Sequence, residues 1–283
     1  MPLSLCMIVK DEAFFLRDCL SAAAPHVDEL VVVDTGSSDN SRAIASNFTD
    51  RVFDYTWHDD YAAARNYSLA QARHEWILVL DADELITPTD FSALHQVIAR
   101  TDLDGFFLQQ YNYNNDQTAY GWQAAQDLEL SRGFSGYTVN PILRLFRNRT
   151  DIRYTGSIHE TVDASIDEHR QGTLHIPIHH YIDANPARPR SARSLRYLAL
   201  MERELATQPS GRLYSIAATS AMYHAADFSR ARDYFVRAAE MGYRPGHSLE
   251  GAAEACYRAQ DFGAPATSTS VRRPQATAHP PCA

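Results

Sequence analysis

The sequence predicts an α/β fold in which helices flank a mostly parallel sheet, followed by a small all-α segment. Short buried strands alternate with amphipathic helices up to about residue 100. This alternation requires right-handed crossovers, which leave consecutive strands parallel. From residue 191 onward the apolar residues recur at helical spacing instead. A sheet of this kind binds its ligands at the carboxyl ends of its strands.

Apolar runs mark the early strands, and helical spacing marks the helices between them. The first strand covers residues 3–9, and a helix follows over residues 12–23. Thr87 and Pro88 begin a later helix as its cap and its first residue. The other early elements are strands at residues 30–33, 51–53 and 76–80 and helices at residues 41–48 and 62–72.

The pattern is less regular beyond residue 100. Strands are expected at residues 105–110, 142–146 and 174–178. The polar, aromatic stretch at residues 111–137 shows no clear periodicity, which is typical of a substrate loop or lid.

An internal repeat marks the helical segment. Residues 223–228 are echoed by residues 257–262, an offset of 34 residues, which is the tetratricopeptide period. We therefore expect a catalytic domain at residues 1–185 and a tetratricopeptide-like segment at residues 186–262. Residues 263–283 lack an apolar face and are expected to form a disordered tail.

Charge and hydropathy argue against nucleic-acid binding and against a membrane-spanning segment. The net charge of −9 disfavours nucleic acid as a partner, because proteins that bind nucleic acid usually carry a basic surface. No apolar run approaches the ~20 residues that a transmembrane helix needs. We expect a cytoplasmic protein, either free or peripheral at the inner face of the cell membrane, and the helical segment offers a surface for a homo-oligomer.

The strongest chemical signal is a pair of acids, Asp81 and Asp83, that follows the fourth strand. Asp81, Ala82, Asp83 and Glu84 follow the apolar run at residues 76–80. Clustered carboxylates repel one another and need a cation, and oxygen ligands suit Mg²⁺ or Mn²⁺. Such a metal is typically shared with a diphosphate. Taken alone, the pair fits a helix-capping or solvated acidic turn as well as it fits a metal site.

Three further polar segments fall where the ends of strands or the start of a helix meet the same crevice. They are Lys10-Asp11-Glu12, Asp34-Thr35-Gly36-Ser37-Ser38-Asp39 and Asp60-Tyr61-Ala62-Ala63-Ala64-Arg65-Asn66. Together with the acid pair, this ordered set resembles the family-2 glycosyltransferases of the GT-A type. The closest likeness is to a bacterial subgroup with C-terminal tetratricopeptide repeats. The likeness is close over residues 1–90 and looser to residue 181.

The resemblance implies roles for the donor-binding residues. Val9 and Glu12 would line the nucleotide pocket, and Asp34 would contact the base or ribose. Arg65 would lie near the ribose or diphosphate. Asp81, Ala82 and Asp83 would together bind the donor. Asp81 would contact the ribose or the metal, and Asp83 would bind the metal. Each residue has an alternative: Asp34 and Asp39 could organise the turn, and Arg65 could be a salt-bridge partner.

The resemblance also implies a catalytic base and a further metal ligand. Glu160 is the first candidate for the base that takes the acceptor's proton, and Asp127 is the second. The alternative for Glu160 is an ion pair with a nearby arginine. His180 would complete the metal shell, although a histidine at the end of a strand is more often a plain hydrogen-bonded residue.

The resemblance implies an inverting, metal-dependent glycosyltransferase. It would use Mn²⁺ or Mg²⁺ and a UDP-, GDP- or dTDP-sugar, with a glycan, a lipid-linked sugar or a peptide as the acceptor. One alternative is a sugar nucleotidyltransferase, but such enzymes carry a glycine-rich basic loop where this chain has Lys10-Asp11-Glu12. The other is a non-enzymatic interaction protein whose tetratricopeptide-like helices bind a partner on a glycosyltransferase-like scaffold.

Overall fold

A computed structural model describes residues 1–119, 121–127, 129–181, 184–185 and 190–260. The chain divides into two compact units, Met1–Glu204 and Leu205–Ala283. The expected tail, residues 263–283, lies outside the described residues, and the expected domain boundaries stay a prediction.

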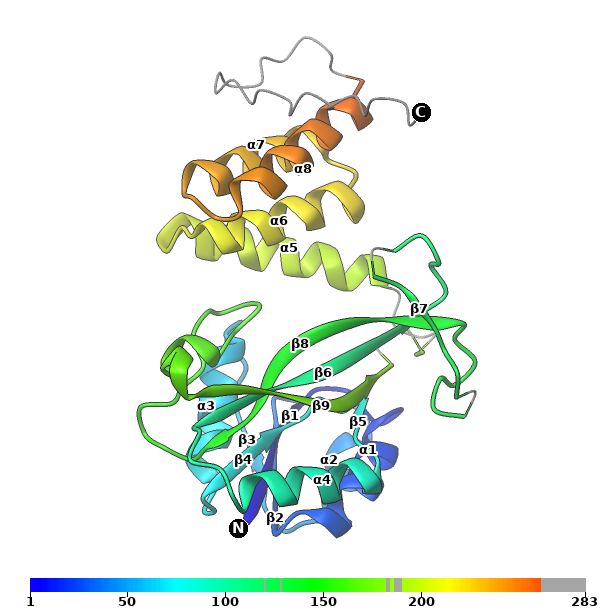
Figure 1. The fold of residues 1–283 in the computed structure, drawn as a ribbon, viewed down its shortest axis with the longest axis vertical. Helices are drawn as coiled ribbons and strands as arrows, with labels where there is room; N and C mark the ends of the chain where they lie inside the picture. Colours follow the sequence, from blue (N-terminus) through cyan, green and yellow to red (C-terminus); the bar gives the residue numbers. More distant parts are fainter. Residues whose placement is uncertain (120, 128, 182–183, 186–189, 261–283) are drawn as a thin grey trace, which may run out of the picture. The chain divides into compact units, whose positions relative to one another are not determined.

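The first unit is built on a mixed sheet in which β3, β2, β1 and β4 are parallel neighbours (Figure 1). The order continues with β8, β6, β9 and β5, and β7 pairs with β8. β8 runs antiparallel to β4 and β6, whereas β6 and β9 are parallel. The strands are β1 (Leu3–Val9), β2 (Glu29–Asp34), β3 (Val52–Asp54), β4 (Trp76–Val79), β5 (Glu84–Leu85), β6 (Gly105–Asn114), β7 (Gln123–Ala124), β8 (Gly136–Arg147) and β9 (Gln171–His180).

Helices cover both faces of the sheet, which explains why its central strands are almost entirely apolar. Leu5, Val32 and Leu78 face a core shared with α1 and α4. Cys6, Val33 and Val79 face a second core that contains Leu69 of α3. The helices of this unit are α1 (Leu16–Ala23), η1 (Ala24–His26), α2 (Ser41–Ala45), α3 (Tyr61–Gln71), α4 (Pro88–Ile98), η2 (Asp163–Ser165), η3 (Glu168–Arg170) and most of α5 (Arg190–Thr207).

The predicted α/β class with its parallel N-terminal half is confirmed, and so is the start of α4. Thr87 caps that helix by accepting from the backbone N–H of Asp90, and Pro88 is its first residue. The expected helix at residues 12–23 begins only at Leu16, because the residues before it form a separate turn in which the N–H of Phe15 donates to the carbonyl of Glu12 at 3.0 Å.

The expected loop at residues 111–137 is wrong at both ends. β6 continues to Asn114 and β8 begins at Gly136, and the two strands pair throughout this extension. Tyr111 stacks on Tyr137 with ring centroids 4.3 Å apart. The extension therefore has strand periodicity: Tyr111 and Tyr113 share one face, separated by Asn112, and polar side chains occupy the other.

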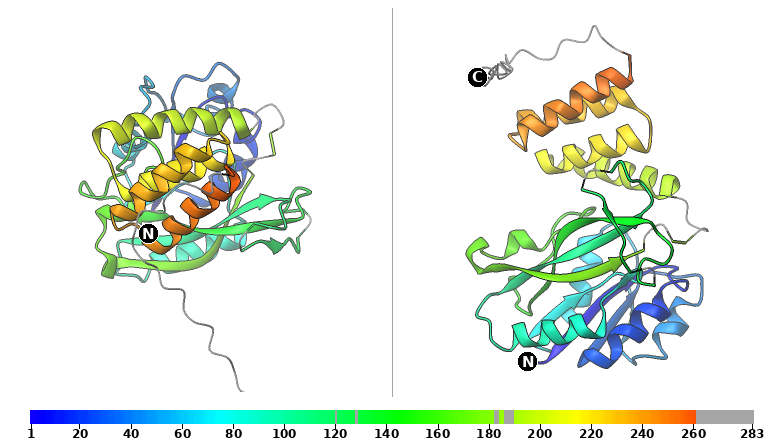
Figure 2. Two further views of the ribbon diagram at one scale, coloured as in Figure 1. Left: turned by 90° about the horizontal axis from the view of Figure 1, so that it is seen from above. Right: turned by 45° about the vertical axis from the view of Figure 1, so that its right-hand side comes forward.

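The second unit contains the helices that the repeat predicted, α6 (Gly211–Tyr223), α7 (Phe228–Glu240) and α8 (Pro245–Arg258). Ala226 and Gln260, 34 residues apart, have almost the same left-handed φ, 51° and 55°. The helices pack closely, because a Cβ added to Gly251 would lie 2.7 Å from the ring of Phe235. Figure 2 shows α7 and α8 side by side. Among the described residues, no helix combines the length and apolar character needed to span a bilayer.

Candidate functional site

The carboxyl ends of β1, β2 and β4 open into a cavity of about 720 Å³. Most of the residues singled out from the sequence line it, although they come from five separate segments of the chain. They are Val9, Glu12, Arg65, Asp81, Ala82, Asp83, Glu160 and His180. Asp34 and Asp127 are not among the lining residues.

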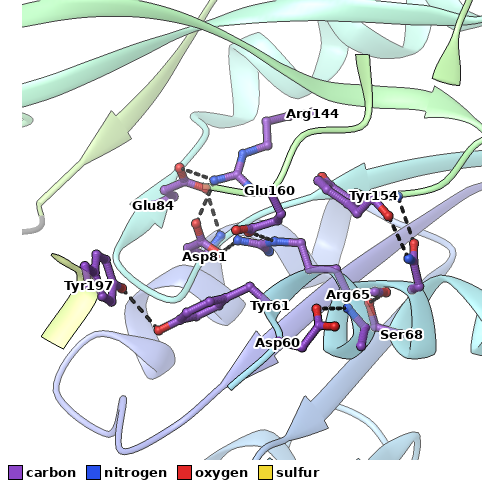
Figure 3. A network of polar contacts seen from close by, with 12 residues as sticks. Asp60, Tyr61, Arg65, Ser68, Asp81, Glu84, Arg144, Tyr154, Glu160 and Tyr197 are labelled. Carbon is purple, nitrogen blue, oxygen red and sulfur yellow. Dashed lines mark hydrogen bonds and ion pairs between the residues drawn. The ribbon is translucent and has the colours of Figure 1, made fainter. Parts of the chain in front are cut away.

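Arg65 reaches the cavity because α3 begins just in front of it. Asp60 caps the helix by accepting from the backbone N–H of Ala63 at 2.8 Å, and Arg65 follows on the next turn. The guanidinium of Arg65 is nearly buried and donates to two carboxylates, to Asp81 at 2.9 Å and to Glu160 at 2.5 Å (Figure 3).

Asp81 lies between two arginines. Arg65 Nη2 donates to its Oδ1, and Arg144 Nη2 donates to its Oδ2 at 2.6 Å (Figure 3). Burial alone would raise the pKa of Asp81, but the charges of Arg144 and Arg65 outweigh it and hold the pKa well below its usual value. Both oxygens of this carboxylate therefore take part in ion pairs.

Glu84 follows Asp81 and Asp83 in the chain and is fully buried. It accepts from the backbone N–H of Asp81 at 2.8 Å, from Gln110 at 2.6 Å and from Arg144 at 3.0 Å. Burial raises the pKa of Glu84 despite the neighbouring arginine. Sequence reasoning missed the roles of Glu84 and Arg144; the available signal was a lone arginine in the apolar strand at residues 142–146.

Asp83 and His180 lie next to each other in the wall of the cavity. The Oδ2 of Asp83 lies 3.5 Å from Nε2 of His180, whose Nδ1 lies 2.6 Å from Asn112 Oδ1. Although burial disfavours the charged imidazole, the carboxylate of Asp83 raises the pKa of His180. Pairing of β5 with β9, with Glu84 opposite His180, fixes this geometry.

A metal ion would find a small set of protein donors here. Among the described residues, no three His, Cys, Asp or Glu side chains form a group arranged to hold a metal. Asp83 and His180 are nonetheless a carboxylate and an imidazole on the same wall. One or two protein ligands completed by substrate phosphates and water are the usual environment of Mg²⁺, so the residues fit a metal shared with a ligand.

The two candidates for the base lie in different surroundings. Glu160 is in the cavity, and its side chain is in the ion pair with Arg65 that was the alternative for it. Asp127 lies on an exposed turn, where its Oδ1 accepts from the backbone N–H groups of Glu129 and Leu130 at 2.9 Å. The structure therefore does not bring Asp127 together with the acid pair.

Asp34 organises the turn after β2 instead of facing the cavity. Its Oδ1 accepts from the backbone N–H groups of Gly36 at 3.0 Å and Ser37 at 2.7 Å. Gly36 has a φ of 102°, a conformation that favours glycine. Thr35, the next residue, lines the cavity in its place.

Aromatic side chains outside the predicted site residues also line the cavity. Trp57 and Tyr61 meet edge to face with centroids 4.7 Å apart, and the hydroxyl of Tyr61 donates to that of Tyr197. Tyr197 belongs to α5 and lies in the same compact unit as the sheet.

The chain is similar in sequence to several known proteins. The sequence profile described as "Glycosyl transferase family 2" matches residues 4–154. A TPR repeat-containing protein of Synechococcus elongatus is 37% identical over 163 residues, which are 58% of this chain and 36% of that protein. The SPbeta prophage-derived glycosyltransferase SunS of Bacillus subtilis is 25% identical over 156 residues, 54% of this chain and 33% of SunS. The chain thus spans about a third of the length of these relatives.

Solved structures show the same fold. The crystal structure of S. aureus TarS 1–349 superposes with a TM-score of 0.50 and covers 93% of each chain at 12% identity. A second TarS structure, in complex with UDP, gives the same TM-score and coverage. At this identity the likeness concerns the arrangement of the sheet and its helices.

Proposed function

Because the chain belongs to glycosyl transferase family 2, we propose that it moves a sugar from a nucleoside-diphosphate donor to an acceptor hydroxyl in this cavity. The observation that carries the proposal is the meeting of Asp83, His180 and Glu160 in one cavity at the carboxyl end of β4. A glycan, a lipid-linked sugar or a peptide would be the acceptor.

The size and walls of the cavity suit such a donor. Its volume of about 720 Å³ falls within the ~300–1,000 Å³ of typical ligand pockets. Ile8, Val9 and Phe15 supply an apolar wall beside the end of β1, against which a nucleoside would lie. The TarS structure of the same fold was solved in complex with UDP, which supports the choice of a nucleoside diphosphate.

The charges of the wall argue for a divalent cation. Arg65 and Arg144 are both ion-paired with carboxylates of the chain, so their charges are already matched. An incoming diphosphate would add negative charge beside Asp83. We propose that Asp83 and His180 hold Mn²⁺ or Mg²⁺, which would neutralise the departing diphosphate. Asp81, with both oxygens bound by arginines, would shape the turn instead of binding the metal.

The proposed reaction is a direct displacement with inversion at the anomeric carbon. The acceptor oxygen forms its bond to that carbon as the bond to the diphosphate oxygen breaks. Glu160 takes the proton of the acceptor hydroxyl, and Arg65 holds the Glu160 carboxylate in place through Nε. The bonding electrons leave with the diphosphate.

Isothermal titration with UDP, GDP and dTDP, each with and without Mn²⁺, tests the proposal. We expect one nucleoside diphosphate to bind, and to bind more tightly with Mn²⁺. If none of the three binds under either condition, the donor site does not exist, and the interaction-protein alternative becomes the better account.

A further inference from the structure

Arg144 connects the sheet to the acid pair. It lies on β8, one residue from Leu145, which pairs with Leu78 of β4. This register places the guanidinium at the point where β4 ends and the acid pair begins. The side chain of Arg144 is only 4% exposed, so the ion pairs it makes are largely shielded from water.

One nitrogen of Arg144 binds two carboxylates. Its Nη2 donates to Asp81 Oδ2 at 2.6 Å and to Glu84 Oε1 at 3.0 Å (Figure 3). Two carboxylates this close, one of them fully buried, repel each other unless a cation lies between them. Arg144 thus allows the buried Glu84 and the partly exposed Asp81 to lie side by side.

Glu84 extends this hold to the backbone. It accepts from the N–H of Asp81, and the N–H of Glu84 donates to the carbonyl of Asp81 at 3.0 Å. Hydrogen bonds therefore join the first and last residues of the turn at residues 81–84, and Arg144 binds the side chains of both. Asp83 lies within this turn, where its carbonyl accepts from the N–H of Tyr181 at 3.0 Å.

We propose that Arg144 is a positioning residue for the donor site: by binding Asp81 and Glu84 together, it holds the turn so that the carboxylate of Asp83 faces His180. The inference rests on the proposed function of the cavity. Arg144 acts through the turn, and not by contact with the reacting atoms.

Arg147 provides a matched control on the same strand. It is also largely buried and is ion-paired with a carboxylate, that of Glu75, and its guanidinium lies 4.3 Å from the centroid of the Trp76 ring. It does not line the cavity. Truncating Arg147 therefore removes a largely buried, ion-paired arginine from the same strand without touching the turn at residues 81–84.

The experiment compares Arg144→Ala, Arg147→Ala and the wild type in the full chain. Titration calorimetry measures the affinity for UDP with Mn²⁺, or for GDP or dTDP if the wild type prefers one of them. We expect Arg144→Ala to lose roughly 10–100-fold in affinity, the usual effect of losing a partner that orients a metal ligand. Arg147→Ala should stay within about twofold of the wild type, a loss of at most ~0.4 kcal/mol.

Chemical rescue separates positioning from a general structural defect. Guanidinium chloride at low millimolar concentration, far below denaturing levels, can occupy the space that Arg144→Ala leaves. We expect it to restore part of the lost affinity in this variant alone, while urea at the same concentration does not. Affinity of a folded Arg144→Ala equal to that of the wild type overturns the proposal, as does an equal loss in Arg147→Ala.

A double variant covers the case in which Arg144→Ala does not fold. Glu84→Gln with Arg144→Met removes both charges of the buried pair, a change that proteins usually tolerate better than removing one. Weakened nucleotide binding by this folded variant supports the proposal, and wild-type affinity overturns it. Failure of the wild type itself to bind any of the three nucleotides is a different outcome, because it refutes the proposed function.

Discussion

Arg65 Nε lies 2.5 Å from Glu160 Oε1, and Nη2 of the same guanidinium lies 2.9 Å from Asp81 Oδ1. A single arginine therefore connects the candidate base to the turn that carries the candidate metal ligand. The link restrains the side chain of Glu160 in the cavity. A base in this position needs the acceptor to supply a hydroxyl at short range.

Replacing Glu160 with Gln tests its role as the base. We expect kcat for sugar transfer to fall by roughly 10²–10⁴-fold, because the amide cannot take the acceptor's proton. Nucleotide affinity should change little, since the amide oxygen can still accept from Arg65. Glu29→Gln is the control, because Glu29 is a buried carboxylate paired with Arg51 outside the cavity. Transfer by Glu160→Gln at the wild-type rate would leave Glu160 as an ion-pair partner only.

Replacing Asp83 with Asn tests the metal ligand through activity. The side chain is partly exposed, so the fold should survive the change. Losing a direct ligand should cost more than the roughly 10–100-fold that follows loss of an orienting partner. Release of nucleoside diphosphate from the donor, followed by mass spectrometry, measures the loss. A variant that keeps more than half of the wild-type rate is incompatible with a metal held by Asp83.

Lys10 offers a direct probe of the cavity, because it is the only lysine in the sequence and it lines the wall. We expect Mn²⁺ and a nucleoside diphosphate to slow the reaction of its amine with an acylating reagent. Peptide mass spectrometry measures the rate, and the amino group of Met1 serves as the internal control. Equal labelling of Lys10 with and without nucleotide would place the ligand elsewhere.

Asp104 predicts a pH-dependent contribution to stability away from the cavity. It accepts from Arg170 Nε at 2.5 Å and from Arg149 Nη1 at 3.2 Å, and the hydrogen bonds from Arg170 lower the pKa of Asp104. A lowered pKa in the folded state means that the contribution is fully present above the unfolded value of about 4. It is lost as the pH falls through the folded pKa.

Urea unfolding of Asp104→Asn and wild type at several pH values measures this contribution. Both arginines are about half exposed, so we expect the variant to be less stable by only roughly 1 kcal/mol at pH 7. The difference should shrink as the pH falls toward 3. A difference that stays constant with pH would mean that the charge of Asp104 is not what stabilises the fold.

The sequence predicted the features that depend on local pattern. β1 has the expected bounds, and the cap at Thr87 is where its side-chain chemistry placed it. The repeat at residues 223–228 and 257–262 predicted paired helices, and Ala226 and Gln260, at equivalent places in the two copies, have a similar φ. These features could be read because each depends on residues that are near one another in the chain.

The rest depends on contacts between distant segments. Arg144 meets Asp81 only because β8 pairs antiparallel with β4, a pairing that no local pattern specifies. Asp34 could bind a ligand or its own turn through similar hydrogen bonds, so the sequence does not decide between them. In the structure its carboxylate accepts from the backbone N–H groups of Gly36 and Ser37. The strand was not predicted beyond residue 110 because the polar residues on one face of the β6 extension are also typical of a loop.

Electron paramagnetic resonance of Mn²⁺ is the most direct test of the cation at Asp83. The signal of free Mn²⁺ is followed as wild type or Asp83→Asn is added in the presence of limiting UDP, or of the nucleotide that calorimetry selects. We expect the wild type to deplete the free Mn²⁺ signal when nucleotide is present and Asp83→Asn to do so far more weakly. Equal depletion by the two proteins would contradict a cation site at Asp83.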